Sequence, residues 1–354
     1  MSDRKVSLLL PGYIENRFLN IDPSSSVGSA PAPETLSFSE DLDRQPWQSQ
    51  LANILKLDTA DGKRLPAARV GLLDADQQGL AAVHTEDTAL VRADPISLKA
   101  DRDSATLISP EQLLLTQEES VELILALNEF VAEDGLTFFS RDPVEWYMSG
   151  KSASALDSYP PSFLANRNAS TFLPDGDGAA TWRRLMTEIQ MLLHAHPVNR
   201  EREQRGLMPV NSVWFWGGAP LPPTGAQKSG IILFADDRQA RLLARHLGVT
   251  CMPLPNFTSA LNDLPQGNDI VVLDLSVFHA WLNKEPDQFE RELARINEQW
   301  LPPLCRHVSS GELERVQLLT EDGLQGVCDQ HTQHLGVSVS PTSWLARLRD
   351  VLRR

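Results

Sequence analysis

The chain has 354 residues and a formal net charge of −15 at pH 7. An acidic chain repels phosphate backbones and anionic lipid surfaces, so the charge argues against general nucleic-acid binding and against membrane association. Hydrophobic residues make up 42% of the chain and charged residues 22%, which excludes a mostly disordered protein. Three cysteines argue against a disulfide framework, and no apolar run approaches the roughly 18–20 residues of a membrane helix. We therefore expect a cytoplasmic globular protein.

The N-terminal part is predicted to hold one strand and one helix. Residues 6–10 form an apolar run that stops at Pro11-Gly12, which is typical of a buried strand followed by a turn. Residues 20–39 are rich in Ser, Pro and Ala and are predicted to form a surface loop. Apolar residues then recur at helical spacing over 47–55, with Pro46 near the start, so a helix is expected there.

A small α+β insertion is predicted over residues 68–150. Thr116 and Glu119 have the spacing of a helix cap, and the helix that they begin is expected to end before Gly135. Alternating apolar residues on either side of this helix indicate short strands. The expected elements are strands at 89–91 and 96–98, a helix over 116–132, and a hairpin of strands at 136–139 and 145–148.

A linker rich in Ser, Pro and Gly is predicted over 151–178, and a long helix over 180–196 follows it. Trp214-Phe215-Trp216 indicates a strand, and we expect all three rings to be buried because strands of a parallel sheet are covered on both faces. The last third alternates between strands at 231–234, 270–273 and 315–319 and helices at 239–247, 288–300 and 344–352. This alternation predicts an α/β fold with a doubly wound, mostly parallel sheet, whose core we assign to residues 1–67 and 179–354.

Polar residues gather at the end of the long helix and after the strand at 231–234. His194 and its neighbours Asn199, Arg200 and Arg205 are open to three interpretations: a solvated helix end, a ligand site or a metal site. Asp236-Asp237 follows a strand end, where open α/β sheets bind ligands, although an acid there also caps a following helix. Cys328-x-x-His331-x-x-His334 has the spacing of metal ligands but lacks a fourth one, which favours a surface loop.

The most specific motif of the chain spans residues 196–218, H-P-V-N-R followed by R-G-L-M-P-V-N-S-V-W-F-W-G-G. This stretch resembles a segment of the archaeal-type cofactor-independent phosphoglycerate mutases, which belong to the alkaline-phosphatase-like superfamily. The chain resembles more closely the bacterial RpfE-type regulatory proteins, through V-R-A-D-P-I at 91–96 and the W-R-x-L-x-x-E-I-Q-M-L-x-H helix at 182–194. The resemblance covers most of residues 68–305 and implies an alkaline-phosphatase-like core with a smaller α+β insertion.

Three positions depart from the mutase pattern. The first strand runs into Pro11 where the mutases have a metal-binding Asp, and only Pro46 matches their nucleophile segment. Gly323 stands where their last metal-binding His would be. A two-metal phosphoryl-transfer site needs these groups together. The resemblance therefore implies a catalytically degenerate protein without a metal cofactor, which acts as a regulatory or binding protein.

The resemblance also implies a ligand site between core and insertion, because these parts face each other across the substrate cleft in the mutases. We expect Arg92 and one of Arg200 or Arg205 to hold a phosphate or carboxylate there. A salt bridge between Arg92 and Asp94 is the structural alternative. The expected ligand is a phosphorylated metabolite or a protein partner, and the candidate ligand-binding residues are Arg92, Asp94, His194, Asn199, Arg200, Arg205 and Asn211.

The competing hypothesis is an enzyme, a phosphomutase or phosphatase with a rearranged manganese or zinc site. Such a site needs several carboxylates or imidazoles near the ends of the parallel strands. The residues that meet this condition in the sequence are Asp236, Asp237, Asp274, His279 and Asp322. Composition and spacing alone leave the choice between enzyme and binding protein open.

Overall fold

The computed structural model divides into two compact units, which we describe separately. The first unit is formed by residues 1–56 and 224–354, and the second by residues 57–223. Within these limits the structure describes residues 4–11, 37–39, 45–57, 65–74, 89–101, 104–150, 158–165, 167–173, 179–225, 230–255, 268–283, 285–320 and 325–329. The helix expected at 344–352 and most of the loop expected at 20–39 lie outside the described residues.

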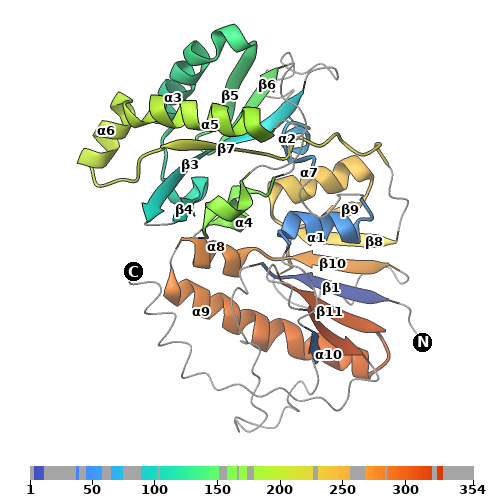
Figure 1. Cartoon of the computed structure of the whole chain (residues 1–354). Coiled ribbons are helices and arrows are strands. Elements are labelled where there is room, and N and C mark those ends of the chain that lie inside the picture. The colour runs from blue at the N-terminus through green and yellow to red at the C-terminus, as the bar shows by residue number, and fades with distance from the viewer. Residues whose placement is uncertain are drawn as a thin grey trace. The chain divides into compact units, whose positions relative to one another are not determined.

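The first unit is built on a seven-stranded sheet with the order β2-β12-β11-β1-β10-β8-β9 (Figure 1). The strands from β11 to β9 are parallel, whereas β12 and β2 add an antiparallel edge. The bounds are β1 Lys5–Leu9, β2 Ser37–Ser39, β8 Ile231–Ala235, β9 Thr250–Met252, β10 Asp269–Leu273, β11 Arg315–Leu319 and β12 Gln325–Asp329. The mostly parallel sheet expected from the alternation of strands and helices is thus confirmed.

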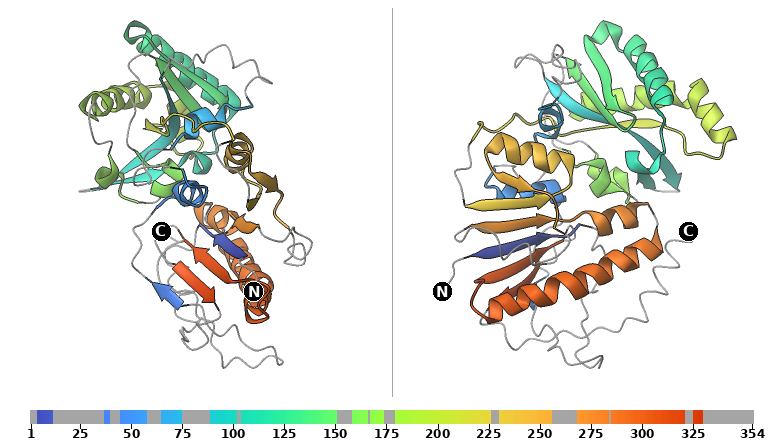
Figure 2. Two further views of the ribbon diagram at one scale, coloured as in Figure 1. Left: turned by 90° about the vertical axis from the view of Figure 1, so that its right-hand side faces the viewer. Right: turned by 180° about the vertical axis from the view of Figure 1, so that it is seen from behind.

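Helices cover both faces of this sheet, as a doubly wound fold requires (Figure 2). One face carries α8, α9 and α10, whose apolar residues share a core with Val6 and Leu8 of β1. Figure 2 shows α1 and α7 on the opposite face. The bounds are α1 Trp47–Ile54, α7 Arg238–Leu247, α8 Ser276–Leu282, α9 Pro286–Arg295, a π-helical turn Ile296–Trp300 and α10 Leu301–Ser309. The helix expected at 288–300 is therefore longer than predicted.

The second unit holds a five-stranded sheet in which β3 is the central strand. The order is β4-β3-β6-β5, and β7 pairs with β3 as well. All of these pairs are antiparallel. The bounds are β3 Leu90–Asp101, β4 Ser104–Ile108, β5 Leu136–Asp142, β6 Glu145–Gly150 and β7 Ser212–Trp216.

Helices α3 and α5 pack on this sheet, α3 against β5 and α5 against β7. Thr116 begins α3 with the expected capping box, since Glu119 N donates to Thr116 Oγ1 and Thr116 N donates to Glu119 Oε2. Pro197 ends the long helix as expected, but it also begins α6. The bounds are α2 Ala67–Gly71, α3 Gln117–Phe130, α4 Pro161–Leu164, α5 Ala179–His194 and α6 Pro197–Gln204. None of the described helices is both long and apolar enough to cross a membrane.

Two expectations about the second unit need correction. The short strands at 89–91 and 96–98 are one strand, β3, which runs through the polar group between them. Pro95 fits there because β6 pairs with β3 only up to Arg92 and β4 pairs with it only from Ser97, so no partner on that side requires its missing N–H. The Trp-rich strand β7 pairs antiparallel with β3 and does not join the parallel sheet. The structure thus places residues 179–223 in the second unit, whereas the sequence assigned them to the core.

Candidate functional site

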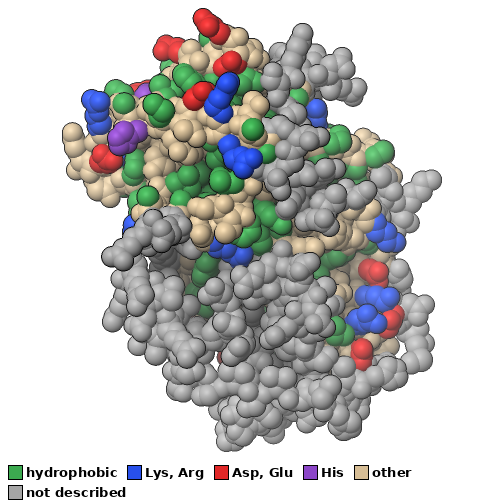
Figure 3. Space-filling view, in the orientation of Figure 1, with side chains coloured by type: hydrophobic (Ala, Val, Ile, Leu, Met, Phe, Trp, Pro, Cys, Tyr) green, Lys and Arg blue, Asp and Glu red, His purple; other side chains and the backbone are tan. Residues whose placement is uncertain are grey.

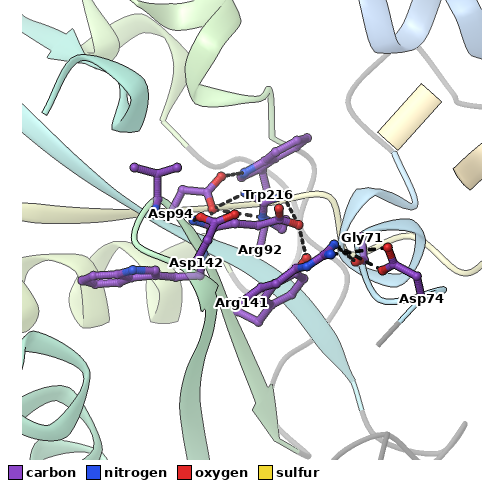
Figure 4. Close-up of polar contacts among 11 residues, drawn as sticks. Gly71, Asp74, Arg92, Asp94, Arg141, Asp142 and Trp216 are labelled. Carbon is purple, nitrogen blue, oxygen red and sulfur yellow. Dashed lines mark hydrogen bonds and ion pairs between the residues drawn. The ribbon is translucent and has the colours of Figure 1, made fainter. Parts of the chain in front are cut away.

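The first candidate site is a group of charges buried in the second unit, centred on Arg92 and Asp94 of β3 (Figure 4). Arg92 donates from Nε and Nη2 to Asp94 Oδ1, at 3.0 and 2.7 Å. Its Nη1 forms an ion pair with Glu145 Oε1 at 3.2 Å, although the angles are not those of a hydrogen bond. Arg92 is 5% exposed and Asp94 is 2% exposed. The structural alternative considered for Arg92, a salt bridge with Asp94, is what the structure contains.

Aromatic side chains enclose this group. Trp216 Nε1 donates to Asp94 Oδ2 at 2.6 Å, and the backbone N–H of Trp146 donates to Asp94 Oδ1 at 3.3 Å. The Arg92 guanidinium lies over the rings of Tyr147 and Trp216, 5.2 and 5.4 Å from their centroids. The Tyr147 hydroxyl donates to Glu145. These contacts tie β3, β6 and β7 together, so the group stabilises the sheet.

The charges in this group do not balance, because one guanidinium faces the two carboxyl groups of Asp94 and Glu145. Burial raises the pKa of Asp94 to about 7, against the lowering effects of Arg92 and of the Trp216 N–H, and repulsion from Glu145 adds to the rise. Burial also raises the pKa of the Tyr147 hydroxyl far above its usual range. A proton is therefore held more tightly at Asp94 in the folded chain than in the unfolded chain.

The raised pKa of Asp94 predicts that the free energy of unfolding depends on pH. Because the pKa of Asp94 rises from 3.8 to about 7 on folding, the folded state binds more protons between these values. The contribution of Asp94 to the free energy of unfolding should then fall as the pH rises from about 4 to 7. Urea unfolding of the wild type and of Asp94→Asn across this range measures how the free energy of unfolding changes with pH. The fall that Asp94 causes should be absent from the variant. Equal slopes in both proteins would contradict the shifted pKa.

Two predicted ligand residues satisfy backbone groups of the fold. Asn199 is 2% exposed; its side chain donates to the carbonyls of Leu193 and Val210 and accepts from the N–H of Val210. Asn211 bridges β3 in the same manner, since it accepts from Leu98 N and donates to Leu98 O. A side-chain amide that replaces a strand partner in this way holds the chain in register. A binding role for either residue stays a prediction.

The remaining predicted ligand residues lie on α5, on α6 and just beyond α6. His194 and Arg200 are exposed, and Arg205 pairs with Glu119 at 3.0 Å. On the described part of the face seen in Figure 3, basic side chains of the second unit stand among acidic and apolar ones and form no single patch. Among the described residues of that face, no local basic surface stands out that would overcome the net charge of −15.

The structure does not bring Arg92 together with the later group. Arg92 lies opposite Trp216 in the β3–β7 register, whereas Asn211 bonds to Leu98 at the other end of the pair. Trp216 comes five positions after Asn211 along the chain, which is roughly 17 Å in a strand. Both groups also belong to the second unit. The shared cleft predicted for Arg92 with Arg200 or Arg205 is therefore not formed by these residues.

The second candidate site is the edge of the first unit's sheet where the parallel strands end. Asp236 and Asp237 follow β8, and Asp274 follows β10. Asp237 caps α7, since its Oδ1 accepts from Ala240 N at 2.8 Å, so the capping interpretation is correct for this residue. Asp236 Oδ1 accepts from Leu254 N at 3.1 Å. Each carboxylate thus fixes the loop that leaves its strand.

Asp274 is the buried acid of this edge, 3% exposed, and both of its oxygens are engaged. Oδ1 accepts from the N–H of Ser276 at 2.9 Å, and Oδ2 forms an ion pair with Arg295 Nη2 at 2.5 Å. Arg295 also donates to Ser276 Oγ at 3.0 Å and from Nε to Glu292 at 2.7 Å. The guanidinium therefore sits between two carboxylates and a hydroxyl.

The other members of the alternative metal site do not complete it. His279 lies on α8 beside the Phe278 ring, and Asp322 is outside the described residues. β1 is followed by the buried, apolar Leu10, and β11 by Thr320. Across the described ranges, no three His, Cys, Asp or Glu side chains converge as metal ligands. The donors described at this edge do not fit a dinuclear manganese or zinc centre.

Two arginines with several contacts each, Arg202 and Arg295, are not among the predicted site residues. Arg202 is fully buried, pairs with Glu119, and donates to the carbonyls of Leu113 and Met208. Its spacing from the apolar Val198, four residues, was a usable signal that it lies on the inner face of α6. Arg295 gave no such signal, because its partner Asp274 lies on a different element.

Comparison with known proteins adds a distant relationship. No protein-family model matches the chain. A 2,3-bisphosphoglycerate-independent phosphoglycerate mutase of Methanothrix thermoacetophila is 41% identical over 63 residues, 18% of this chain and 16% of that protein. A probable mutase of the same name from Geobacter sulfurreducens is 30% identical over 112 residues, 30% of this chain and 27% of that protein. The matches thus span less than a third of these two relatives.

Among solved structures, the chain is similar to the cofactor-independent phosphoglycerate mutase of Thermoplasma acidophilum, with 14% identity and a TM-score of 0.35 over 100% of this chain and 99% of that one. The fold assignment rests on the strand order of the chain itself. The segments of this chain that match, 63 and 112 residues long, are distantly homologous to cofactor-independent phosphoglycerate mutases.

Proposed function

We propose that this chain is a phosphoglycerate-mutase-like protein that has lost metal-dependent phosphoryl transfer and acts in the cytoplasm as a regulatory or binding protein of the RpfE type. The observation that carries this proposal is the ion pair between Arg295 and Asp274 at the carboxyl edge of the parallel sheet. A guanidinium is always protonated and has no acceptor for a metal. It occupies the carboxylate that a metal ion at this strand end would need.

A metal site at this edge of the sheet depends on the balance of charge. A two-metal site uses several carboxylates and imidazoles to hold ions about 4 Å apart and to activate a nucleophile. Among the residues described at this edge, the buried carboxylate is Asp274, which is neutralised by Arg295, and a divalent ion beside a guanidinium would be repelled by it. Leu10 offers no donor at the end of β1. The mutase mechanism therefore lacks its electrostatic basis among these residues.

A second candidate is supported by the names of the relatives, which are phosphoglycerate mutases. In that case the chain is a metal-dependent phosphomutase or phosphatase. Asp274 would have to leave Arg295, and Asp236, Asp237, His279 and Asp322 would have to converge with it. Metal content separates the two proposals, because only this one requires a bound ion.

The experiment is a metal and activity assay of the purified full chain. The protein is incubated with manganese or zinc, passed through gel filtration, and analysed for bound metal and for phosphomutase and phosphatase activity. We expect substoichiometric metal and no activity above buffer. About two equivalents of retained metal together with turnover would overturn the proposal and establish the enzyme.

A matched pair of variants tests the role of Arg295. Arg295→Met leaves Asp274 and Glu292 without their cation, so manganese should raise the melting temperature of this variant by several degrees and leave the wild type unchanged. Arg291→Met, an exposed arginine on the same helix, is the control and should behave as the wild type. Equal manganese responses in all three proteins would show that Arg295 does not exclude the ion.

The ligand of the proposed binding function is a phosphorylated metabolite or a protein partner. His194, Arg200 and Arg205 are the exposed members of the predicted ligand set, and Arg205 pairs with Glu119. Arg92, Asp94, Asn199 and Asn211 are buried or bonded within the fold. Titration with phosphorylated three-carbon acids, comparing the wild type with Arg200→Ala, therefore tests the metabolite without disturbing the fold.

A further inference from the structure

Two cysteines that lie on different elements meet in the core of the first unit. Cys305 lies on α10 and Cys328 on β12, and the two elements pack against each other. They are 6% and 5% exposed and belong to the same hydrophobic cluster. Mutual interaction between the two thiols raises the pKa of Cys305 and lowers the pKa of Cys328. The surface loop expected around Cys328 is therefore wrong for this residue, whose side chain is buried on a strand, while His331 and His334 lie outside the described residues.

The local structure explains why both side chains point to the same place. Cys305 lies on the inner face of α10 with Leu301, Leu304 and Val308, which are its neighbours at helical spacing. Cys328 pairs with Val316 of β11, and both belong to the cluster beneath that helix. Helix and strand therefore direct one thiol each toward their common contact.

The third cysteine does not take part in this contact. Cys251 lies on β9, at the opposite edge of the described sheet from β12 and β2. Four strands separate β9 from β12, which corresponds to roughly 24 Å at the usual strand spacing. Cys251 is therefore too far from Cys328 to form a disulfide with it, and Cys305 is the cysteine that lies on a neighbouring element.

We propose that Cys305 and Cys328 form a redox-active dithiol, which a peroxide oxidises reversibly to a disulfide between α10 and β12. Cys328 sulfur attacks one oxygen of hydrogen peroxide and the O–O bond breaks; the departing hydroxide takes the Cys328 thiol proton and becomes water, and Cys328 is left as a sulfenic acid. Cys305 sulfur then attacks the Cys328 sulfur and the S–O bond breaks; the departing hydroxide takes the Cys305 thiol proton and becomes a second water. Two thiols lose two electrons and one peroxide becomes two waters, so the reaction balances.

The surroundings favour this order of events. Interaction with Cys305 lowers the pKa of Cys328, while that interaction and burial raise the pKa of Cys305. The thiolate is the attacking form, and this direction makes Cys328 the more readily ionised of the two thiols. Disulfides in reducing compartments are usually transient, which fits a reversible switch.

The consequence of oxidation is a covalent link across the antiparallel edge of the sheet. The disulfide closes a loop of roughly two dozen residues that contains β11 and holds β12 against α10. β12 is also the strand on which β2 pairs. Oxidation should therefore fix this edge and raise the melting temperature of the first unit by about 6–12 °C.

The test uses the full chain with Cys251→Ser, so that the two proposed thiols are the only ones left. The protein is treated with hydrogen peroxide, then denatured, and its free thiols and intact mass are measured. We expect both thiols to disappear together, the mass to fall by about 2 Da, and dithiothreitol to restore both values. The oxidised protein should show the higher melting temperature.

Two controls keep the test decisive. In the wild type, non-reducing peptide mapping should find a peptide that joins Cys305 to Cys328, which requires no substitution. Adding Cys305→Ser to the Cys251→Ser chain should leave a single thiol that gains oxygen and forms no internal link. Retention of both thiols under peroxide, or links only between separate chains, would overturn the proposal, which is independent of the metal and activity assays.

Discussion

Replacing Arg92 with methionine is expected to lower the free energy of unfolding of the second unit by about 3–5 kcal/mol. The substitution leaves the buried carboxyl group of Asp94 and the half-buried one of Glu145 without their shared cation. It also removes the guanidinium from the rings of Tyr147 and Trp216. Breaking a buried ion pair from one side costs more than the pair contributes, because the remaining charges stay desolvated.

Urea unfolding followed by tryptophan fluorescence measures this effect, and Arg184→Met is the matched control. Arg184 pairs with Glu188 on the surface of α5, with its side chain 74% exposed, so its replacement should change stability by less than about 0.5 kcal/mol. If Arg92→Met unfolded like the wild type, the ion pairs of Arg92 would not stabilise the second unit. A role of Arg92 in ligand binding would then have to be considered again.

Truncation of Trp214 to alanine is expected to cost about 3–5 kcal/mol as well. The prediction that Trp214, Phe215 and Trp216 are buried is confirmed, with exposures of 0, 0 and 3%. Trp214 also donates from Nε1 to the carbonyl of Tyr159 at 2.9 Å. The variant therefore leaves a cavity in the core of the second unit and removes this hydrogen bond.

Thermal and urea unfolding of Trp214→Ala give this value, with Leu125→Ala as the control. Leu125 is 57% exposed on α3, so its truncation should cost far less than that of a core residue. If Trp214→Ala melted like the wild type, the ring would be available for binding instead of packing.

These two experiments bear on how the predicted ligand set is interpreted. Buried polar residues need hydrogen-bond partners, and in this fold the partners of Arg92, Asp94, Asn199 and Asn211 are other parts of the same unit. Such residues give a chain specific motifs even where no ligand is bound. Motif similarity to an enzyme can therefore reflect an inherited scaffold as well as an inherited site.

The sequence by itself determined the local elements of this protein. The apolar run at 6–10, the capping box of Thr116 and Gly248 in a left-handed conformation after α7 correspond to structural features that depend on neighbouring residues only. The alternation of strands and helices after residue 230 likewise predicted the parallel sheet, because parallel strands need crossover connections.

Only the tertiary structure decided which elements meet. β7 is as apolar as a parallel strand, and nothing local shows that its partner is β3. The same holds for Arg92 with Glu145, Arg295 with Asp274 and Cys305 with Cys328, whose members lie on different elements. Hydrophobic periodicity records which face of an element is buried but not what covers it. Partner choice depends on packing and charge complementarity summed over the whole unit, and that is why the site could not be read from the sequence alone.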